Sequence, residues 1–245
     1  ECPGDELLAA LGEVAGEGNL IAEDLGIIPP SVIEMRRRHN IPGMAVLQFA
    51  FDGSKENLHL PDNITKEVIC YTGTHDNDTT VGWYSSIDQN TRENVARTLA
   101  GENTVDKGER PIHRRLMRAG MVSQAAVTII PLQDVMGLDS SARMNIPGTK
   151  EGNWNWQFMW TDIAQTDLNW LAATTEATGR WQEGRTVSGK DEDALIATGH
   201  SEVMTDGLDH LEDSYRGIEE ETRGGGDSEK TGGIIAYFSA EIGLQ

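Results

Sequence analysis

The sequence has few cysteines, few basic residues and no long apolar run, and each shortage excludes a class of protein. Its two cysteines, Cys2 and Cys70, cannot form the dense disulfide framework of a small secreted domain, so we predict a reducing, cytoplasmic location. No apolar run approaches the roughly 18 residues needed to span a bilayer. Against 40 acidic residues there are only 20 lysines and arginines, giving a net charge of -20. This charge disfavours nucleic acid and anionic membranes as partners, but it does not repel a neutral sugar.

The composition changes along the chain and divides it into three parts. Residues 183–230 hold 14 acidic against 5 basic residues, few aromatics and a run of three glycines. Such a segment is typical of a solvated linker, here with helical stretches. We therefore predict an α/β domain over residues 1–182, an acidic linker over 183–230, and the start of a further domain at 231–245.

Strand-like and helix-like segments alternate through the first part. We predict strands at residues 19–22, 44–51, 68–73 and 125–132, helices at 5–14, 30–40, 91–100, 112–123 and 167–178, and a structured loop at 139–160. Apolar strands separated by helices favour a parallel sheet with helices covering it. Four strands of this kind are about half of an eight-stranded (β/α)8 TIM barrel.

Acidic residues follow two of these strands. Glu23 and Asp24 come directly after the first strand, and His75 and Asp76 follow the third. An unpaired carboxylate at the end of a buried strand is costly, so stability alone does not explain this placement. Carboxylates at the ends of barrel strands can cleave sugar linkages.

Simpler interpretations of the same residues stay open. Glu23 also fits an acid on a surface loop, and His75 and Asp76 also fit a turn closed by side-chain hydrogen bonds. Together with Asp78, the latter two are acceptable metal ligands. Their spacing matches no known zinc pattern, however, and the cysteines do not join them. We predict no metal and no organic cofactor.

Four motifs carry a family resemblance: IAEDLG, PGMAVLQFAF, YTGTHDNDTTVGWY and PLQDVMGLDSSARMNIPGTKEGNWNW. In that order they resemble the amylomaltase family of 4-α-glucanotransferases over roughly residues 3–180. The resemblance implies that this chain is the C-terminal half of a (β/α)8 barrel of the α-amylase clan. It also implies retaining transfer of α-1,4-glucan segments between maltooligosaccharides, with a maltooligosaccharide or α-glucan as substrate.

The resemblance also implies roles for individual residues. Glu23 matches the family's acid/base, and Asp76 matches the carboxylate that stabilises the oxocarbenium-like transition state, with His75 donating to the same sugar. A retaining mechanism needs a second carboxylate about 5–5.5 Å from the acid/base. The family's nucleophile is an aspartate on an upstream strand with no match here, and Asp24 does not replace it. We therefore expect the isolated chain to be inactive. The alternative is a non-catalytic glucan-binding fragment.

Three further residues are weaker candidates for sugar binding. Gln48 sits in an apolar strand and either reaches the active face or is a polar strand residue. Asn145 and Trp154, with Trp156 nearby, fit the lining of a glucan groove because aromatic faces stack on sugar C–H surfaces. Tryptophans at alternate positions also fit a hydrophobic core.

The end of the chain has its own resemblance. The segment IAYFSAEIGL, residues 235–244, resembles the opening strand of an α-glucan phosphorylase domain. It predicts a parent chain in which a fused phosphorylase domain follows the transferase through the acidic linker.

Overall fold

The computed structural model describes residues 3–16, 18–100, 111–180 and 233–237. The predicted acidic linker and the last residues of the phosphorylase-like segment lie outside the described residues. The division into three parts therefore stays a prediction. Within the described ranges, no helix has the length and apolar character needed to cross a bilayer.

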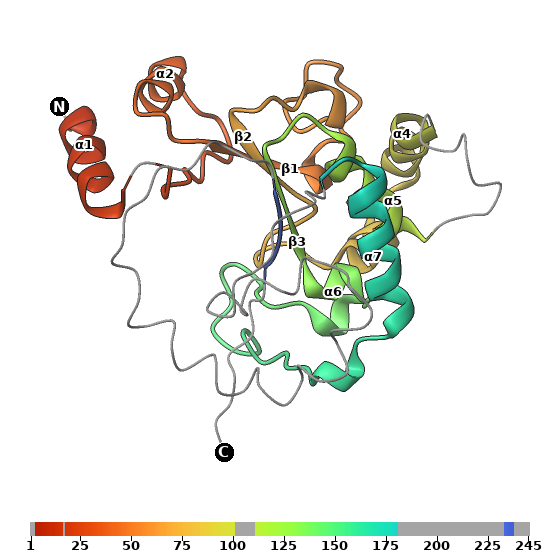
Figure 1. Cartoon of the computed structure of the whole chain (residues 1–245). Coiled ribbons are helices and arrows are strands. Elements are labelled where there is room, and N and C mark those ends of the chain that lie inside the picture. Colours follow the sequence, from red (N-terminus) through yellow and green to blue (C-terminus); the bar gives the residue numbers. More distant parts are fainter. Residues whose placement is uncertain (1–2, 17, 101–110, 181–232, 238–245) are drawn as a thin grey trace.

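The centre of the structure is a parallel sheet, as the sequence predicted (Figure 1). Its strands, in spatial order, are β1 (Gly43–Val46), β2 (Val68–Tyr71), β3 (Val127–Pro131) and β4 (Gly233–Tyr237). Neighbouring strands pair in parallel, with Gly43 opposite Val68 and Cys70 opposite Thr128. Because all strands run the same way, their carboxyl ends meet at one edge of the sheet.

Two details of the strand prediction differ from the structure. Residues 19–22 form an extended loop rather than a strand. Their backbone contact with the sheet runs from Ala22 N to Pro42 O (2.9 Å), and Pro42 has no N–H with which to continue a ladder. β1 ends at Val46, because Leu47–Phe49 turns into the short 3-10 helix η1. β4, at the start of the phosphorylase-like segment, pairs with β3 in the same sheet.

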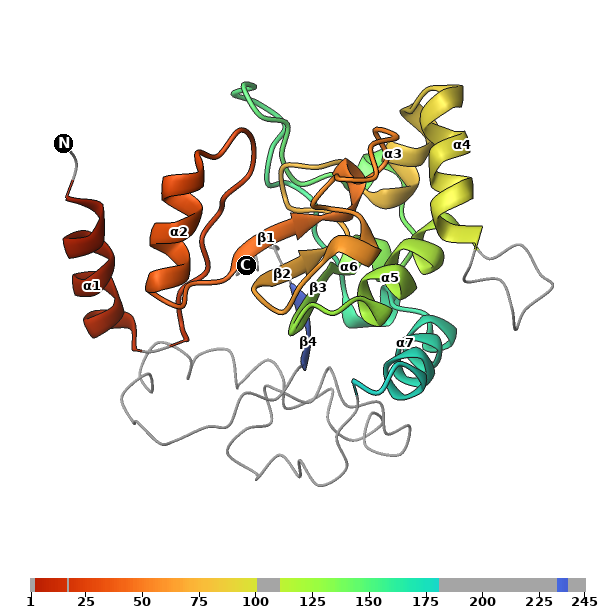
Figure 2. The same ribbon diagram turned by 90° about the horizontal axis from the view of Figure 1, so that it is seen from above.

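Each predicted helix is present, with ends shifted by a few residues. These helices are α1 (Gly4–Ala15), α2 (Pro30–Arg38), α4 (Gln89–Thr98), α5 (Ile112–Val122) and α7 (Gln165–Ala177). The prediction missed the short helices α3 (Thr80–Ser86), α6 (Leu132–Val135), η2 (Pro61–Asn63), η4 (Ser140–Ala142) and η5 (Trp160–Asp162). α5 and α7 lie on one side of the strands, and α1 and α2 lie toward the other end (Figures 1 and 2).

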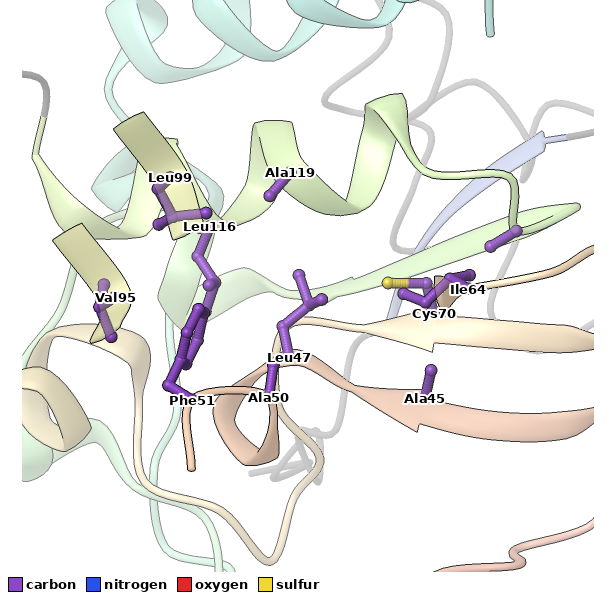
Figure 3. Packing of buried hydrophobic residues seen from close by; sticks show 11 residues of the cluster. Ala45, Leu47, Ala50, Phe51, Ile64, Cys70, Val95, Leu99, Leu116 and Ala119 are labelled. Atoms are coloured by element: carbon purple, nitrogen blue, oxygen red, sulfur yellow. The ribbon is translucent and has the colours of Figure 1, made fainter. Parts of the chain in front are cut away.

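The main hydrophobic core lies between α5 and the first two strands (Figure 3). Leu116 and Ala119 of α5 face Leu47 and Cys70 across this core. The helix approaches the sheet closely at Gly120, where an added Cβ would lie 3.0 Å from Thr128 Cγ2. A second cluster joins β3 and α6 to α7; its buried members are Met117, Met121, Ile130, Leu132, Val135, Ile163 and Leu171. Together the two clusters fix the strand ends that carry the candidate site.

Cys70 is a core residue, as predicted. It is fully buried in β2, and burial raises the pKa of its thiol to about 12. The thiolate is the reactive form, so we expect iodoacetamide to leave Cys70 unmodified in a folded Cys2→Ser variant at mildly alkaline pH. In concentrated guanidinium chloride, mass spectrometry should then show complete alkylation. Labelling of the folded variant at the rate of a free thiol would show that β2 is not packed as described.

Candidate active site

The loop of residues 72–80, between β2 and α3, carries the motif His75-Asp76. It is closed by Asn77, whose Oδ1 accepts from Thr74 N (2.9 Å) and Thr74 Oγ1 (2.8 Å). Asn77 N in turn donates to Thr74 O (3.1 Å). A turn closed by side-chain hydrogen bonds is therefore present, but Asn77 closes it. The carboxylate of Asp76 is left outside the turn.

Asp76 lies beside two other residues that the sequence singled out. Its Oδ1 accepts from Asn145 Nδ2 (2.5 Å) and lies 3.3 Å from His75 Nε2. The side chain of Asp76 keeps 44% of its surface exposed, and that of His75 keeps 36%. The structure thus gathers a carboxylate, an imidazole and an amide from two distant segments, and leaves them open to solvent. We call Asp76, His75 and Asn145 the polar cluster.

Arg143 holds the polar cluster together through hydrogen bonds to backbone carbonyls. Its Nη2 donates to Asp76 O (2.8 Å) and its Nε donates to Asn145 O (2.9 Å). The backbone of Asn145 also donates to His75 O (3.1 Å). One guanidinium therefore holds both segments together through their carbonyls. Our sequence interpretation missed Arg143, because its place in the fourth motif does not reveal the carbonyl contacts that it makes.

Trp154 extends the polar cluster with an aromatic surface. Its ring lies against the His75 ring, with centroids 5.1 Å apart and planes tilted by 36°. The backbone of Trp154 has a φ of 60°, a region that bulky residues rarely adopt, and its N–H donates to Met144 O (2.7 Å). Trp154 is 41% exposed, whereas Trp156 stacks on Phe158 beside the second core cluster. The two tryptophans that the sequence paired therefore occupy different surroundings.

Gln48 is hydrogen-bonded to the backbone of the 72–80 loop. It is buried in η1, and its Nε2 donates to Asp78 O (2.8 Å). An added Cβ on Gly73 would lie 2.7 Å from that nitrogen, so the glycine permits the close approach. The carboxylate of Asp78 accepts from Ser140 Oγ (2.6 Å) and from its neighbour Thr79 N (2.8 Å). Sugar binding by Gln48 stays a prediction.

A small cavity adjoins the cluster, between loop 72–80 and the segment after β3. It measures about 20 Å³, roughly the space of one water molecule, and His75, Asp78, Asp134 and Arg143 are among the residues that line it. Among the described residues, no group of three His, Cys, Asp or Glu side chains is arranged to hold a metal ion.

Glu23 and its neighbour Asp24 have opposite environments. Asp24 pairs with Arg36, with Oδ2 to Nε 3.1 Å, and its Oδ1 accepts from Met44 N (2.8 Å). Glu23 is exposed and has no hydrogen bond or ion pair with any residue that the structure describes. These contacts fix the segment beside the first half of β1, whereas Asp76 follows the end of β2. No described contact joins Glu23 to Asp76, so their convergence on one sugar stays a prediction.

The Asp24–Arg36 pair should be important for stability. The two side chains are only 16% and 8% exposed, and removing Asp24 leaves the buried Arg36 guanidinium with two backbone carbonyls as its only described partners, and with no opposite charge. We expect Asp24→Ala to lower the free energy of unfolding by about 3 kcal/mol, measured by urea denaturation. The matched control is Glu67→Ala in the Arg37–Glu67 pair, where both side chains are more than half exposed and a loss below about 1 kcal/mol is expected. Equal losses in the two variants would contradict this assignment.

A parallel sheet with helices, and with polar groups gathered beyond the carboxyl end of a strand, is characteristic of α/β enzymes that bind polar substrates. Comparison with known proteins identifies the family. The glycoside hydrolase 77 model, described as 4-alpha-glucanotransferase, matches residues 1–162. The chain therefore belongs to the 4-alpha-glucanotransferase family, which confirms the resemblance seen in its motifs.

Individual relatives agree with this assignment. The chain is 43% identical over 182 residues to the 4-alpha-glucanotransferase of Thermus thermophilus, covering 74% of this chain and 36% of the relative. It is 46% identical over 155 residues to a chloroplastic/amyloplastic 4-alpha-glucanotransferase of Solanum tuberosum, covering 63% of this chain and 26% of the relative.

Among solved structures, the amylomaltase of Streptococcus agalactiae in complex with acarbose superposes with a TM-score of 0.67 at 28% identity. That match covers 74% of this chain and 36% of the other. The matches therefore span between 26% and 36% of the length of these relatives.

Proposed function

We propose that the protein is a 4-α-glucanotransferase of the amylomaltase type, which transfers α-1,4-glucan segments between maltooligosaccharides with retention. The observation that carries the proposal is the polar cluster. Asn145 fixes the open carboxylate of Asp76 beside His75, beyond the carboxyl end of a strand, within the part of the chain that matches the family.

The groups of the polar cluster can bind and stabilise a sugar ring that develops positive charge as an oxocarbenium ion forms. In our proposal Asp76 accepts hydrogen bonds from the hydroxyls of the distorted sugar ring, and its negative charge stabilises the positive charge that forms on that ring. Asn145 donates to one oxygen of this carboxylate and fixes its orientation. His75 donates to the same sugar, and the exposed face of Trp154 packs on apolar C–H groups of the glucan.

We assign the proton transfers to Glu23. It protonates the glycosidic oxygen as that bond breaks, and later takes the proton from the 4-OH of the acceptor as the new bond forms. Its exposed side chain, without a described partner, is available for this exchange. Between the two steps a second carboxylate holds the glycosyl unit covalently, a role that the resemblance assigns to an upstream strand.

Three finer statements belong to the same proposal. We propose that the described strands are part of a (β/α)8 barrel, consistent with their parallel order along the sheet. We propose that the enzyme works in the cytoplasm, in line with its scarce cysteines. We also propose that a phosphorylase domain continues from the IAYFSAEIGL segment, which sequencing the gene beyond Gln245 would test.

Incubating the full-length gene product with maltotriose tests the proposed activity. We expect glucose together with maltooligosaccharides longer than maltotriose, at a rate independent of added phosphate and sensitive to acarbose. Binding of maltotriose without redistribution would favour the glucan-binding alternative. Formation of glucose 1-phosphate only when phosphate is supplied would assign the activity to a phosphorylase.

A further inference from the structure

Asp134 is the most deeply buried carboxyl group near the polar cluster. It lies on α6, directly after β3, and is 1% exposed. Its Oδ2 accepts from Thr72 Oγ1 (2.6 Å) and Thr80 Oγ1 (2.8 Å), and its Oδ1 accepts from Thr80 N (2.7 Å). All three donors come from the loop that carries His75 and Asp76.

The two threonines mark the ends of that loop. Thr72 directly follows β2, and Thr80 begins α3, so every residue between them belongs to the loop. Both threonines are fully buried, which shields their hydrogen bonds from competing water. A single carboxylate on α6, the helix that directly follows β3, thus joins the first residue of the loop to the last.

We propose that Asp134 is a positioning residue, which fixes the 72–80 loop so that Asp76 meets the sugar ring in the correct orientation. The part that concerns the sugar rests on the proposed function. The part that concerns the position of the loop does not.

The chemistry of the contact explains why a carboxylate stands there. A carboxylate offers two acceptor oxygens and receives all three donors at once, whereas the amide of an asparagine has only one acceptor oxygen. Burying this group is costly, and desolvation raises the pKa of Asp134 despite the three hydrogen bonds. The other side-chain hydrogen bonds that join the loop to the segment after β3 come from Ser140, Arg143 and Asn145, and they are exposed or only partly buried.

The test compares Asp134→Asn with Asp139→Asn in the whole chain. The control makes the same change five residues further on, at an exposed aspartate that caps η4 through Ser141. Proton–nitrogen NMR follows the side-chain amide of Asn145 and the indole N–H of Trp154, assigned with Asn145→Ala and Trp154→Phe. We expect Asp134→Asn to shift both signals with an unchanged circular dichroism spectrum, and the control to shift neither.

Kinetics separate positioning from a general loss of stability. In the full-length gene product we expect Asp134→Asn to lower kcat on maltotriose about a hundredfold, the cost of a misplacement of roughly 1 Å, with KM nearly unchanged. A purely structural role would instead reduce the amount of folded enzyme and leave the kcat per active site intact.

Each outcome decides the proposal. Unchanged Asn145 and Trp154 signals in folded Asp134→Asn overturn it. If that variant does not fold, Thr72→Val removes one donor and keeps the carboxylate; smaller shifts of the same two signals then support the proposal, and their absence refutes it. If the signals move but the unmodified full-length product does not redistribute maltotriose, the positioning role stands and the proposed function fails.

Discussion

Replacing Glu23 with glutamine in the full-length gene product should lower the turnover of maltotriose about a thousandfold, because general acid–base catalysis contributes roughly 100- to 10,000-fold. Glutamine keeps the shape of the side chain but can neither give a proton to the leaving oxygen nor take one from the acceptor. Binding of maltotriose should change only slightly. Initial rates of glucose release, together with calorimetric binding, provide the measurement.

The choice of donor substrate makes the test specific for a proton donor. Fluoride leaves without protonation, so an α-maltosyl fluoride donor should restore the first step in Glu23→Gln, visible as a burst of fluoride release. Glu13→Gln, an exposed acid on α1, is the control and should keep full activity. Equal impairment with fluoride and with maltotriose would show that Glu23 is not the acid.

Replacing Asp76 with asparagine should impair both donors. Its negative charge is proposed to stabilise the oxocarbenium-like state in every step, and loss of one such interaction costs roughly 100- to 1,000-fold in kcat. The polar cluster should remain assembled in the variant, because the new side chain still offers an oxygen to Asn145. Steady-state kinetics with maltotriose and with α-maltosyl fluoride provide the measurement.

The control for Asp76 is Asp62→Asn, an exposed aspartate on η2 that should have no effect on rate. Asn145→Ala should cause a smaller loss than Asp76→Asn, because it removes the residue that orients the carboxylate but leaves the charge. Rescue of Asp76→Asn by the fluoride donor would contradict the assignment, since it would make Asp76 a proton donor instead.

The parts of the fold that the sequence predicted are those set by local pattern. The apolar segments of β2 and β3 alternate along the chain with the longer helices α2, α4, α5 and α7, which the sequence predicted, so a parallel sheet followed. The same reasoning wrongly predicted a strand at residues 19–22. The apolar residues of this segment looked like a strand, but the partner backbone begins at Pro42, which cannot donate, and glycines with positive φ stand on either side at Gly18 and Gly26.

Residues that act through distant partners could not be found from one sequence. Thr72 and Asp134 are 62 positions apart, and nothing in the sequence around either residue indicates that the two are in contact. Arg143 presents only carbonyl contacts, which any arginine near a turn could make. The residues of the polar cluster were easier to predict, because Asp76 and Asn145 belong to long motifs that resemble a known family.

The central claim is that Glu23 and Asp76 act on the same glucose ring, and a crystal structure of the full-length gene product with acarbose tests it most directly. We expect the Glu23 carboxyl group within hydrogen-bonding distance of the atom that replaces the glycosidic oxygen. Asp76 should bind hydroxyls of the sugar ring adjoining that atom, with Asn145 still at its Oδ1. Acarbose bound with the two carboxyl groups at opposite ends of the sheet, or with either one shut off from the ligand, would contradict the account.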